Sequence, residues 1–335
     1  MRTKVILDVD TGSDDAIAMI LAMMSPKLDV IGVCSVNGNR EVKLTTLNTL
    51  RVAELLGSNV LVYRGCEYPI VATLRPGGGG GTPIREGTYD GLISMIHGDH
   101  LPLPGPEYRA EEKIPAVVYY VQKLMETTEK ITVVAVGPLT NLAMAMRVEP
   151  KICEKIERIV IMGGGYQINN DTPTAEFNIW VDPEAAEIVM RTGEEFGLNI
   201  VWVPLDATHQ CYLSVQDAAH IRSFGNKIAD AVADFIEMRA TGYVKDADMK
   251  ELCASPVHDA LAVAYLLDPQ VLKDIRHVNM HVVTGGGYAD GMTCLDMREL
   301  LDKPAPNCFF ALGADRDRFL KVLYGALKEG AVYSR

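Results

Sequence analysis

The sequence predicts an α/β protein with a single domain: a mainly parallel open sheet with helices on both faces. Short apolar, β-branched runs alternate with helical patterns along nearly the whole chain, and such alternation is typical of parallel sheets covered on both sides. The 335 residues are 48% hydrophobic, which is enough for a large buried core. Because neither an internal repeat nor a linker-like stretch divides the chain, we expect one domain over residues 1–335.

The expected elements follow one another in a regular order. Strands are expected at residues 4–10, 29–36, 60–64, 131–136, 158–163, 199–205, 277–284 and 308–312. Helices are expected at residues 14–24, 41–56, 113–127, 139–147, 183–196, 214–222, 226–240, 258–267 and 315–328. Residues 73–108 interrupt this order with a run of glycines at 77–81 and several prolines. Long irregular segments of this kind are often lids or binding loops, so we expect a loop or lid insertion there.

Composition excludes several classes of function. The net charge of −12 argues against binding to nucleic-acid polymers, which need a basic surface. No apolar run approaches the roughly 20 residues of a membrane span. The seven cysteines are scattered without a CxxC pair, and the N-terminus shows no signal segment, so we expect reduced thiols and a cytoplasmic protein.

Four carboxylates crowd together where the first strand ends, at Asp8, Asp10, Asp14 and Asp15. Asp10 follows the strand, and Asp14 and Asp15 fall in the first turn of the next helix, so this edge of the sheet is a candidate ligand site. Like charges at such spacing repel one another, and a bound hard cation with oxygen ligands relieves the repulsion. The alternative is structural: Asp8 makes hydrogen bonds in the core, and Asp14 and Asp15 cap a helix.

Polar side chains also follow two other expected strands. Asn39 follows strand 29–36, and a loop after strand 158–163 carries Asn170, Glu176 and Asn178. Amide and carboxylate groups of this kind suit the hydroxyls of a sugar. The alternatives are ordinary turn chemistry at Asn39 and a polar surface loop at 170–178.

Two further positions could complete a cation site. The backbone carbonyl of Val136 lies at the turn after strand 131–136, and His258 and Asp259 open an apolar helix. Calcium takes about 6–8 oxygen ligands, more than the first cluster supplies, so Asp259 is a candidate ligand. His258 could act as a general acid. The alternative is that the pair only caps the helix.

Taken together, these motifs resemble the nucleoside hydrolase family of the inosine-uridine-preferring type, over nearly the whole chain. The opening pattern stands here as Asp8-Val9-Asp10-Thr11-Gly12-Ser13-Asp14-Asp15-Ala16, with Thr11 in place of the family's proline. Further matches are Gly38-Asn39, Gly137-Pro138-Leu139-Thr140-Asn141, Met162-Gly163-Gly164, Asn170 to Asn178 and His258-Asp259-Ala260. The family's His-Gly-x-x-Gly-Leu is matched only in part, by His97-Gly98-Asp99-His100-Leu101.

The resemblance implies hydrolysis of the N-glycosidic bond of ribonucleosides with one catalytic Ca²⁺. It implies that calcium is bound by Asp10, Asp15, Asp259 and the carbonyl of Val136. It implies that ribose is bound by Asp14, Asn39, Met162, Asn170, Glu176 and Asn178. Asp10 would accept a proton from the attacking water, and His258 would protonate the leaving base, with Tyr243 as a second candidate near the base.

The resemblance also bears on specificity and partners. Purine-specific relatives place a tryptophan beside the metal-binding aspartate, where this chain has His258, so we expect pyrimidine or broad specificity. We expect a small-molecule ribonucleoside substrate and a homo-oligomer, either a dimer or a tetramer. Two alternatives stay open at this point: a haloacid-dehalogenase-like phosphatase, which also opens with Asp-x-Asp-x-Thr, and a non-catalytic protein that binds calcium or ribose.

Overall fold

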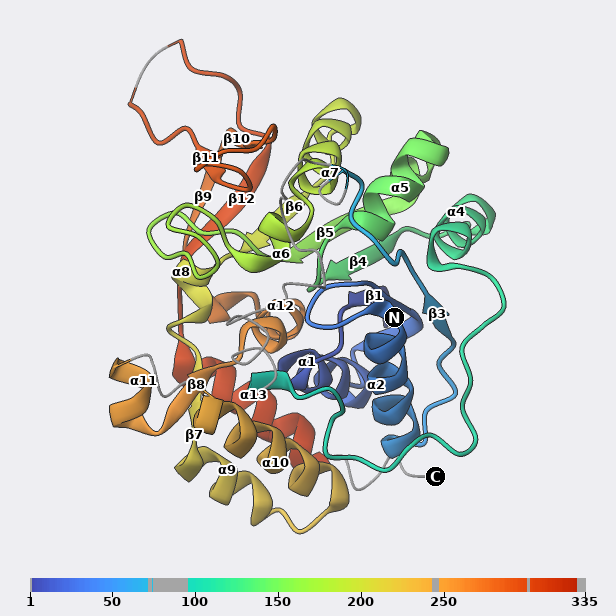
Figure 1. Cartoon of the computed structure of the whole chain (residues 1–335), viewed down its shortest axis with the longest axis vertical. Helices are drawn as coiled ribbons and strands as arrows, with labels where there is room; N and C mark the ends of the chain where they lie inside the picture. Colours follow the sequence, from blue (N-terminus) through green and yellow to red (C-terminus); the bar gives the residue numbers. More distant parts are fainter. Residues whose placement is uncertain (1, 72–73, 75–95, 243–246, 300–301, 330–335) are drawn as a thin grey trace.

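An eight-stranded sheet forms the centre of the protein (Figure 1). The structure, a computed structural model, describes residues 2–71, 74, 96–242, 247–299 and 302–329. In spatial order the strands are β3 (Val62–Arg64), β2 (Leu28–Ser35), β1 (Thr3–Val9), β4 (Ile131–Ala135), β5 (Ile156–Met162), β6 (Ile200–Val203), β12 (Cys308–Ala314) and β9 (Leu272–Val278). Every neighbouring pair is parallel except β12 with β9, which confirms the predicted mainly parallel sheet.

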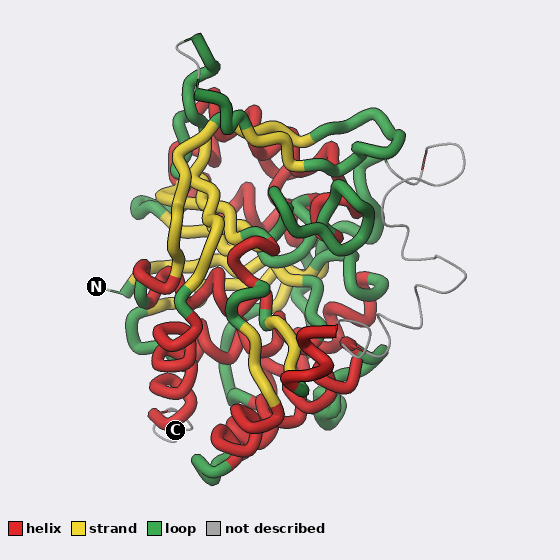
Figure 2. Tube along the Cα trace, turned by 90° about the vertical axis from the view of Figure 1, so that its left-hand side faces the viewer, coloured by secondary structure: helices red, strands yellow, loops and turns green. Residues whose placement is uncertain are grey.

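Helices cover both faces of this sheet, as predicted (Figures 1 and 2). One face packs against α4 (Ala116–Glu126), α5 (Thr140–Val148) and α7 (Pro183–Phe196). The other packs against α1 (Ser13–Met24), α2 (Val42–Leu55), α10 (Lys227–Gly242), α12 (His258–Leu267) and α13 (Arg316–Glu329). Strand β1 feeds both cores because successive side chains point to opposite faces: Val5 and Leu7 lie in one core and Ile6 in the other.

The helix α1 lies in the interior rather than at the surface. All but one of its residues are buried, and an apolar helix of this kind needs protein on every side. It packs against α12, which is itself buried over Ala260–Ala264. This contact joins two segments far apart in the sequence, and it brings the first turns of both helices together.

The order of the strands reverses at the centre of the sheet. From β1 the chain moves outward to β2 and β3, whereas β4, β5 and β6 extend in the opposite direction from β1. The carboxyl ends of β1 and β4 therefore mark the topological switch point, where open α/β sheets bind ligands. Asp10 follows β1 and Val136 follows β4, so two candidate site residues lie at this point.

The predicted strand at 277–284 is wrong, because two elements occupy this region. Strand β9 runs antiparallel at the sheet's edge, and β10 (Met280–Val282) pairs instead with β11 (Thr293–Leu295) in a separate ribbon. The middle of β9 is exposed and rich in charged residues, so it lacks the apolar run that revealed the other strands. Charged edge strands are a common protection against unwanted pairing.

Several short elements also escaped prediction. They are α6 (Phe177–Val181), α8 (Leu205–Thr208), α11 (Ala247–Leu252) and the antiparallel pair β7 (Tyr212–Ser214) and β8 (Ala254–Pro256). The helix α9 (Val215–Arg222) was expected. Elements of three to six residues carry too few positions for a periodic pattern to stand out. None of the described helices combines the length and apolar character needed to cross a bilayer.

Most of the expected loop at 73–108 lies outside the described residues. Residues 98–108 are described and form neither helix nor strand. They lie against α2, where the backbone N–H of Leu101 donates to Asn48 Oδ1 and Arg51 donates to the Leu101 carbonyl. The backbone N–H groups of Glu107 and Tyr108 donate to Glu54, so this part of the loop runs along α2 toward the C-terminal end of that helix.

Candidate functional site

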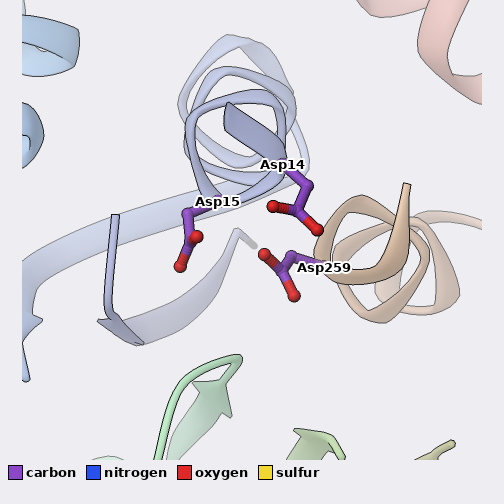
Figure 3. Close-up of side chains that lie close together, drawn as sticks. All are labelled: Asp14, Asp15 and Asp259. Carbon is purple, nitrogen blue, oxygen red and sulfur yellow. The ribbon is translucent and has the colours of Figure 1, made fainter. Parts of the chain in front are cut away.

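Three buried carboxylates converge where α1 and α12 begin (Figure 3). Asp14 and Asp15 lie in the first turn of α1 and Asp259 in the first turn of α12. One oxygen from each lies within 4.8 Å of the others. The positive ends of both helix dipoles favour negative charge here, so the fold gathers acids from residues 14 and 259 into one place.

Asp10 adds a fourth carboxylate beside this group. Its Oδ2 accepts a 2.7 Å hydrogen bond from the backbone N–H of Asn39, and its own N–H donates to Asp15 Oδ1 at 3.1 Å. A Cβ added at Gly38 would overlap Asp10 Oδ2, and one at Gly137 would lie 2.8 Å from Oδ1. The two glycines thus let the turns after β2 and β4 approach Asp10 closely.

Burial and mutual repulsion disfavour charge on most of these groups. Burial, followed by the nearby carboxylates, raises the pKa of Asp10 and of Asp259 well above the usual value. The same two causes raise the pKa of Asp15 to about 6. Like charges in a low-dielectric site shift pKa values in this direction.

Asp14 differs because it has a cationic partner. Burial alone would raise its pKa, but Arg239, His97 and His258 outweigh burial, and the pKa is lowered. Arg239 Nη1 lies 2.8 Å from Asp14 Oδ1, and His97 Nδ1 lies 3.6 Å from the same oxygen. Asp14 therefore carries a stable negative charge that the protein itself balances.

Arg239 was missed by the sequence analysis. It is completely buried on α10, donating to Ser13 Oγ at 3.1 Å and to the Pro256 carbonyl at 2.8 Å. The sequence did carry a sign of its importance, because Arg239 lies on the same face of α10 as the buried residues Val232 and Phe235. A charged residue on a buried face is rarely unpaired, so its position indicated a buried acid as partner.

The candidate ribose contacts surround the acids at the ends of neighbouring strands. Asn39 Nδ2 donates to Asp15 Oδ2 at 3.2 Å. Asn178 Nδ2 donates to the Val136 carbonyl at 2.8 Å and to the carbonyl of Met162, at the end of β5, at 3.1 Å. A carbonyl oxygen has a second lone pair, so the bond to Asn178 leaves Val136 capable of ligation.

Glu176 is buried in the same loop. Its Oε2 accepts hydrogen bonds from the backbone N–H groups of Gly164 at 2.9 Å and Ile179 at 3.3 Å. Burial raises its pKa to about 7, and these hydrogen bonds oppose the shift. The Glu176 carboxylate thus holds the loop at 163–178 against the end of β5.

Two further predicted contacts are Asn170 and Tyr243. Asn170 is exposed, and its Oδ1 accepts a 2.9 Å hydrogen bond from the backbone N–H of Phe177, which shapes the loop. Tyr243 lies outside the described residues. Asn170 therefore supports the conformation of the loop that carries Glu176 and Asn178.

His258 begins α12 next to Asp259 and is buried. Its Nδ1 lies 2.7 Å from Thr208 Oγ1, and its ring centroid lies 5.6 Å from that of His209. Burial lowers its pKa well below the usual value, and the charge of Asp14 partly opposes this. Thr208 lies in the short helix α8, and nothing in the sequence marked it.

Asp8 lies beneath the site and not in it. Tyr120 OH donates to its Oδ2 at 3.0 Å and Asn141 Nδ2 to its Oδ1 at 2.9 Å. Burial raises its pKa to about 7, and both hydrogen bonds oppose the shift. These contacts agree with the structural interpretation of Asp8, which connects β1 to α4 and α5.

The donor set fits a hard divalent cation. The converging atoms are carboxylate oxygens, which hard cations prefer over nitrogen or sulfur. Burial and then the nearby carboxylates raise the pKa values of these acids, and a bound cation would favour their charged forms. Asp10, Asp15 and Asp259 together with the Val136 carbonyl would hold the ion, whereas Asp14 already faces Arg239.

Comparison with known proteins gives one consistent result. A family model described as inosine-uridine preferring nucleoside hydrolase matches residues 5–321. The pyrimidine-specific ribonucleoside hydrolase RihA of Shigella boydii serotype 4 is 35% identical over 333 residues, covering 98% of this chain and 99% of the relative.

Solved structures agree with this result. A plant nucleoside hydrolase, PpNRh1, has a TM-score of 0.85 at 29% identity, covering 98% of this chain and 99% of the other. A purine-preferring ribonucleoside hydrolase from Gardnerella vaginalis has a TM-score of 0.83 at 29% identity, covering 97% and 99%.

Proposed function

The chain belongs to the family of inosine-uridine preferring nucleoside hydrolases, and from this premise we propose that it hydrolyses pyrimidine ribonucleosides to ribose and free base with Ca²⁺ as cofactor. Its class, a hydrolase of N-glycosyl bonds, follows from the family. The observation that carries the cofactor is the convergence of buried carboxylates from α1 and α12. The match over residues 5–321 also decides against the phosphatase alternative.

Asp10 is the proposed general base. When bound, the cation would lower the pKa of the attacking water, and Asp10 would accept the proton that this water loses. Asn39 and the close approach of Gly38 and Gly137 fix the Asp10 carboxylate, so the base is held in one orientation. Fixed geometry of this kind reduces the entropic cost of bringing a base to its substrate.

Ionised Asp14 would stabilise the sugar as its bond to the base breaks. Glycosidic cleavage passes through an oxocarbenium-like transition state with positive charge on the ring. Asp14, kept anionic by Arg239, supplies a preorganised negative charge next to that ring. Asn39, Met162, Asn170, Glu176 and Asn178 complete the proposed ribose contacts, and Asn170 also supports the conformation of its loop.

His258 is the proposed acid for the leaving base. As the C1′–N bond breaks, its electron pair moves to the base nitrogen and the base takes a proton from the doubly protonated His258, which becomes neutral. Burial lowers the pKa of His258, so the protonated ring gives up this proton readily. Water adds its oxygen to C1′ and gives its proton to Asp10, so the products are ribose and the neutral base. Tyr243 stays a second candidate for a contact with the base.

One comparison and one implication of the family resemblance support a pyrimidine substrate. The 35% identical relative is named as pyrimidine-specific, and His258 stands where purine-specific relatives carry a tryptophan that stacks on the base.

A product assay tests the proposal. Purified protein with calcium is incubated with uridine, cytidine, inosine and adenosine, and free base is separated by chromatography. We expect uracil and cytosine release at rates above those of the purines. Faster purine release would overturn the specificity, and binding of uridine without base release would favour a non-catalytic ribose-binding protein.

Cellular context forms a smaller part of the proposal. All seven cysteines are unpaired, which supports a reducing compartment and therefore the cytoplasm. We also expect a homo-oligomer, a dimer or a tetramer, and light scattering of the purified protein would measure its mass directly.

A further inference from the structure

The short helix α8 lies between two parts of the site. Its last residue, Thr208, is completely buried and places Oγ1 2.7 Å from His258 Nδ1. The His258 side chain is buried as well. A hydrogen bond between two buried side chains fixes the ring's orientation, because breaking it would leave polar groups unsatisfied.

We propose that Thr208 is a positioning residue, which commits Nδ1 of His258 to the protein and makes Nε2 the nitrogen that gives a proton to the leaving base. This inference rests on the proposed role of His258. When the C1′–N bond breaks, its electron pair goes to the base. The doubly protonated ring gives its Nε2 proton to the base and becomes neutral, while its Nδ1–H still donates to Thr208 Oγ1.

A hydroxyl suits this task better than an ionised side chain. It can donate to an unprotonated Nδ1 or accept from a protonated Nδ1, since it offers both a proton and lone pairs. The bond to Thr208 therefore survives when the ring changes from one form to the other. An orienting partner on the second ring nitrogen is a general means of fixing a histidine's tautomer.

The position of Thr208 is itself tied to the proposed ribose loop. Two residues earlier, the carboxylate of Asp206 accepts hydrogen bonds from the backbone N–H groups of Tyr166 at 2.7 Å and Gln167 at 2.8 Å. The backbone N–H of Leu205 donates to the Gly164 carbonyl at 3.0 Å. The helix α8 thus fixes the acid and the loop of Glu176 and Asn178 relative to one another.

The test is a pair of substitutions, Thr208→Val and Thr208→Ser, measured on two substrates. Valine keeps the shape and removes the hydroxyl, whereas serine restores it. We expect Thr208→Val to lower kcat for uridine about 10-fold or more, within the range of general acid catalysis. Its kcat for p-nitrophenyl riboside, whose leaving group needs no proton, should stay within about 2-fold. Thr208→Ser should recover most of the uridine rate.

A spectroscopic readout separates positioning from packing. The ¹⁵N signals of the His258 ring report which nitrogen carries the proton, and we expect the Nδ1 signal to move in Thr208→Val and to return in Thr208→Ser. Thr132→Val, a buried threonine of β4, is the matched control and should change neither the ring signals nor the rates. If the valine variant does not fold, Thr208→Ala takes its place.

The outcomes distinguish this inference from the proposed function. Unchanged uridine turnover in Thr208→Val, or equal losses on both substrates, would overturn the role of Thr208. His258→Ala is measured alongside, and it should slow uridine far more than the activated riboside. Equal losses in His258→Ala would instead overturn the acid role of His258 itself.

Discussion

At the scale of single residues, the site consists of acids that the fold holds together against their repulsion. Asp10, Asp15 and Asp259 all have raised pKa values because they are buried among like charges. The pKa of Asp14 is lowered instead, because Arg239 lies next to it. Neighbouring carboxylates thus have two different roles. The charge of Asp14 is balanced by Arg239, whereas Asp10, Asp15 and Asp259 are the proposed ligands of a cation.

Replacing Asp10 tests the role of the base. Asp10→Ala removes the proposed proton acceptor, and we expect a loss of about 10²-fold or more in kcat for uridine, the usual contribution of a general base. Circular dichroism should show an unchanged fold, because the substitution also removes a repelling charge. Asp248→Ala, at an exposed position of α11, is the control. Wild-type turnover by Asp10→Ala would exclude the assignment.

Glu176 gives a pH dependence whose sign is fixed. Its pKa is about 7 in the folded protein and 4.5 as the ordinary value, so between these values the native state holds a proton that the unfolded state has lost. The free energy of unfolding therefore falls as pH rises through this window.

Denaturant unfolding with chelator present, at pH 5, 6, 7 and 8, measures this effect. Glu176→Gln cannot titrate, so we expect a shallower fall with pH than in wild type. Glu157→Gln alters an exposed carboxylate of β5 and should leave the wild-type slope. An unchanged slope in Glu176→Gln would mean that its carboxyl group titrates normally.

Residues differ in how far the sequence could predict them. Asp10, Asp14, Asp15 and Asp259 were found because acids beyond strands and at helix starts form a chemical pattern. Arg239 and Thr208 were missed, since their importance arises from contacts across hundreds of residues or between short elements. Only the break in the apolar stripe at Arg239 carried a local signal.

At the scale of elements, the turns after neighbouring strands shape the space around Asp10. The turn after β2 brings Gly38 against Asp10 Oδ2, and that after β4 brings Gly137 against Oδ1. Side chains at these positions would have to displace the carboxylate, because the atoms nearest to the added Cβ belong to Asp10. The two turns therefore restrict the position of the Asp10 carboxylate, the proposed base.

Gly38→Ala tests whether the turn after β2 restricts the position of the Asp10 carboxylate. The added Cβ would displace the end of the Asp10 side chain, so we expect a loss of about 10-fold or more in kcat with a small change in stability, since misplacing a catalytic group is costly. Gly105→Ala is the matched control, because nothing lies within 4 Å of the added Cβ. Equal rates in both variants would show that the turn leaves Asp10 room to move.

Long elements were predictable and short or exposed ones were not. The buried strands β1 and β4 and the helices α1 and α12 stand out as apolar runs of sufficient length. Strand β9 was misplaced because its exposed, charged face hides the pattern. The helix α8, with its four residues, offers no period to detect, although it holds both Asp206 and Thr208.

At the scale of the whole molecule, the site depends on a contact between two segments far apart in the sequence. The packing of α1 against α12 places Asp259 beside Asp14 and Asp15 at the topological switch point. The strand-helix alternation predicted the class of fold and the edge at which ligands bind. It could not predict that residues some 240 positions apart meet, since that depends on how two buried helices pack.

The most direct test of the account is the dependence of uridine hydrolysis on a divalent cation. Protein freed of metal by a chelator is assayed for uracil release before and after calcium is added back, with Asp259→Asn measured in parallel. We predict negligible release without metal, recovery on addition of calcium to wild type, and little recovery in Asp259→Asn. Full uracil release by the chelated protein, or none after calcium is restored, would contradict a cation held jointly by α1 and α12.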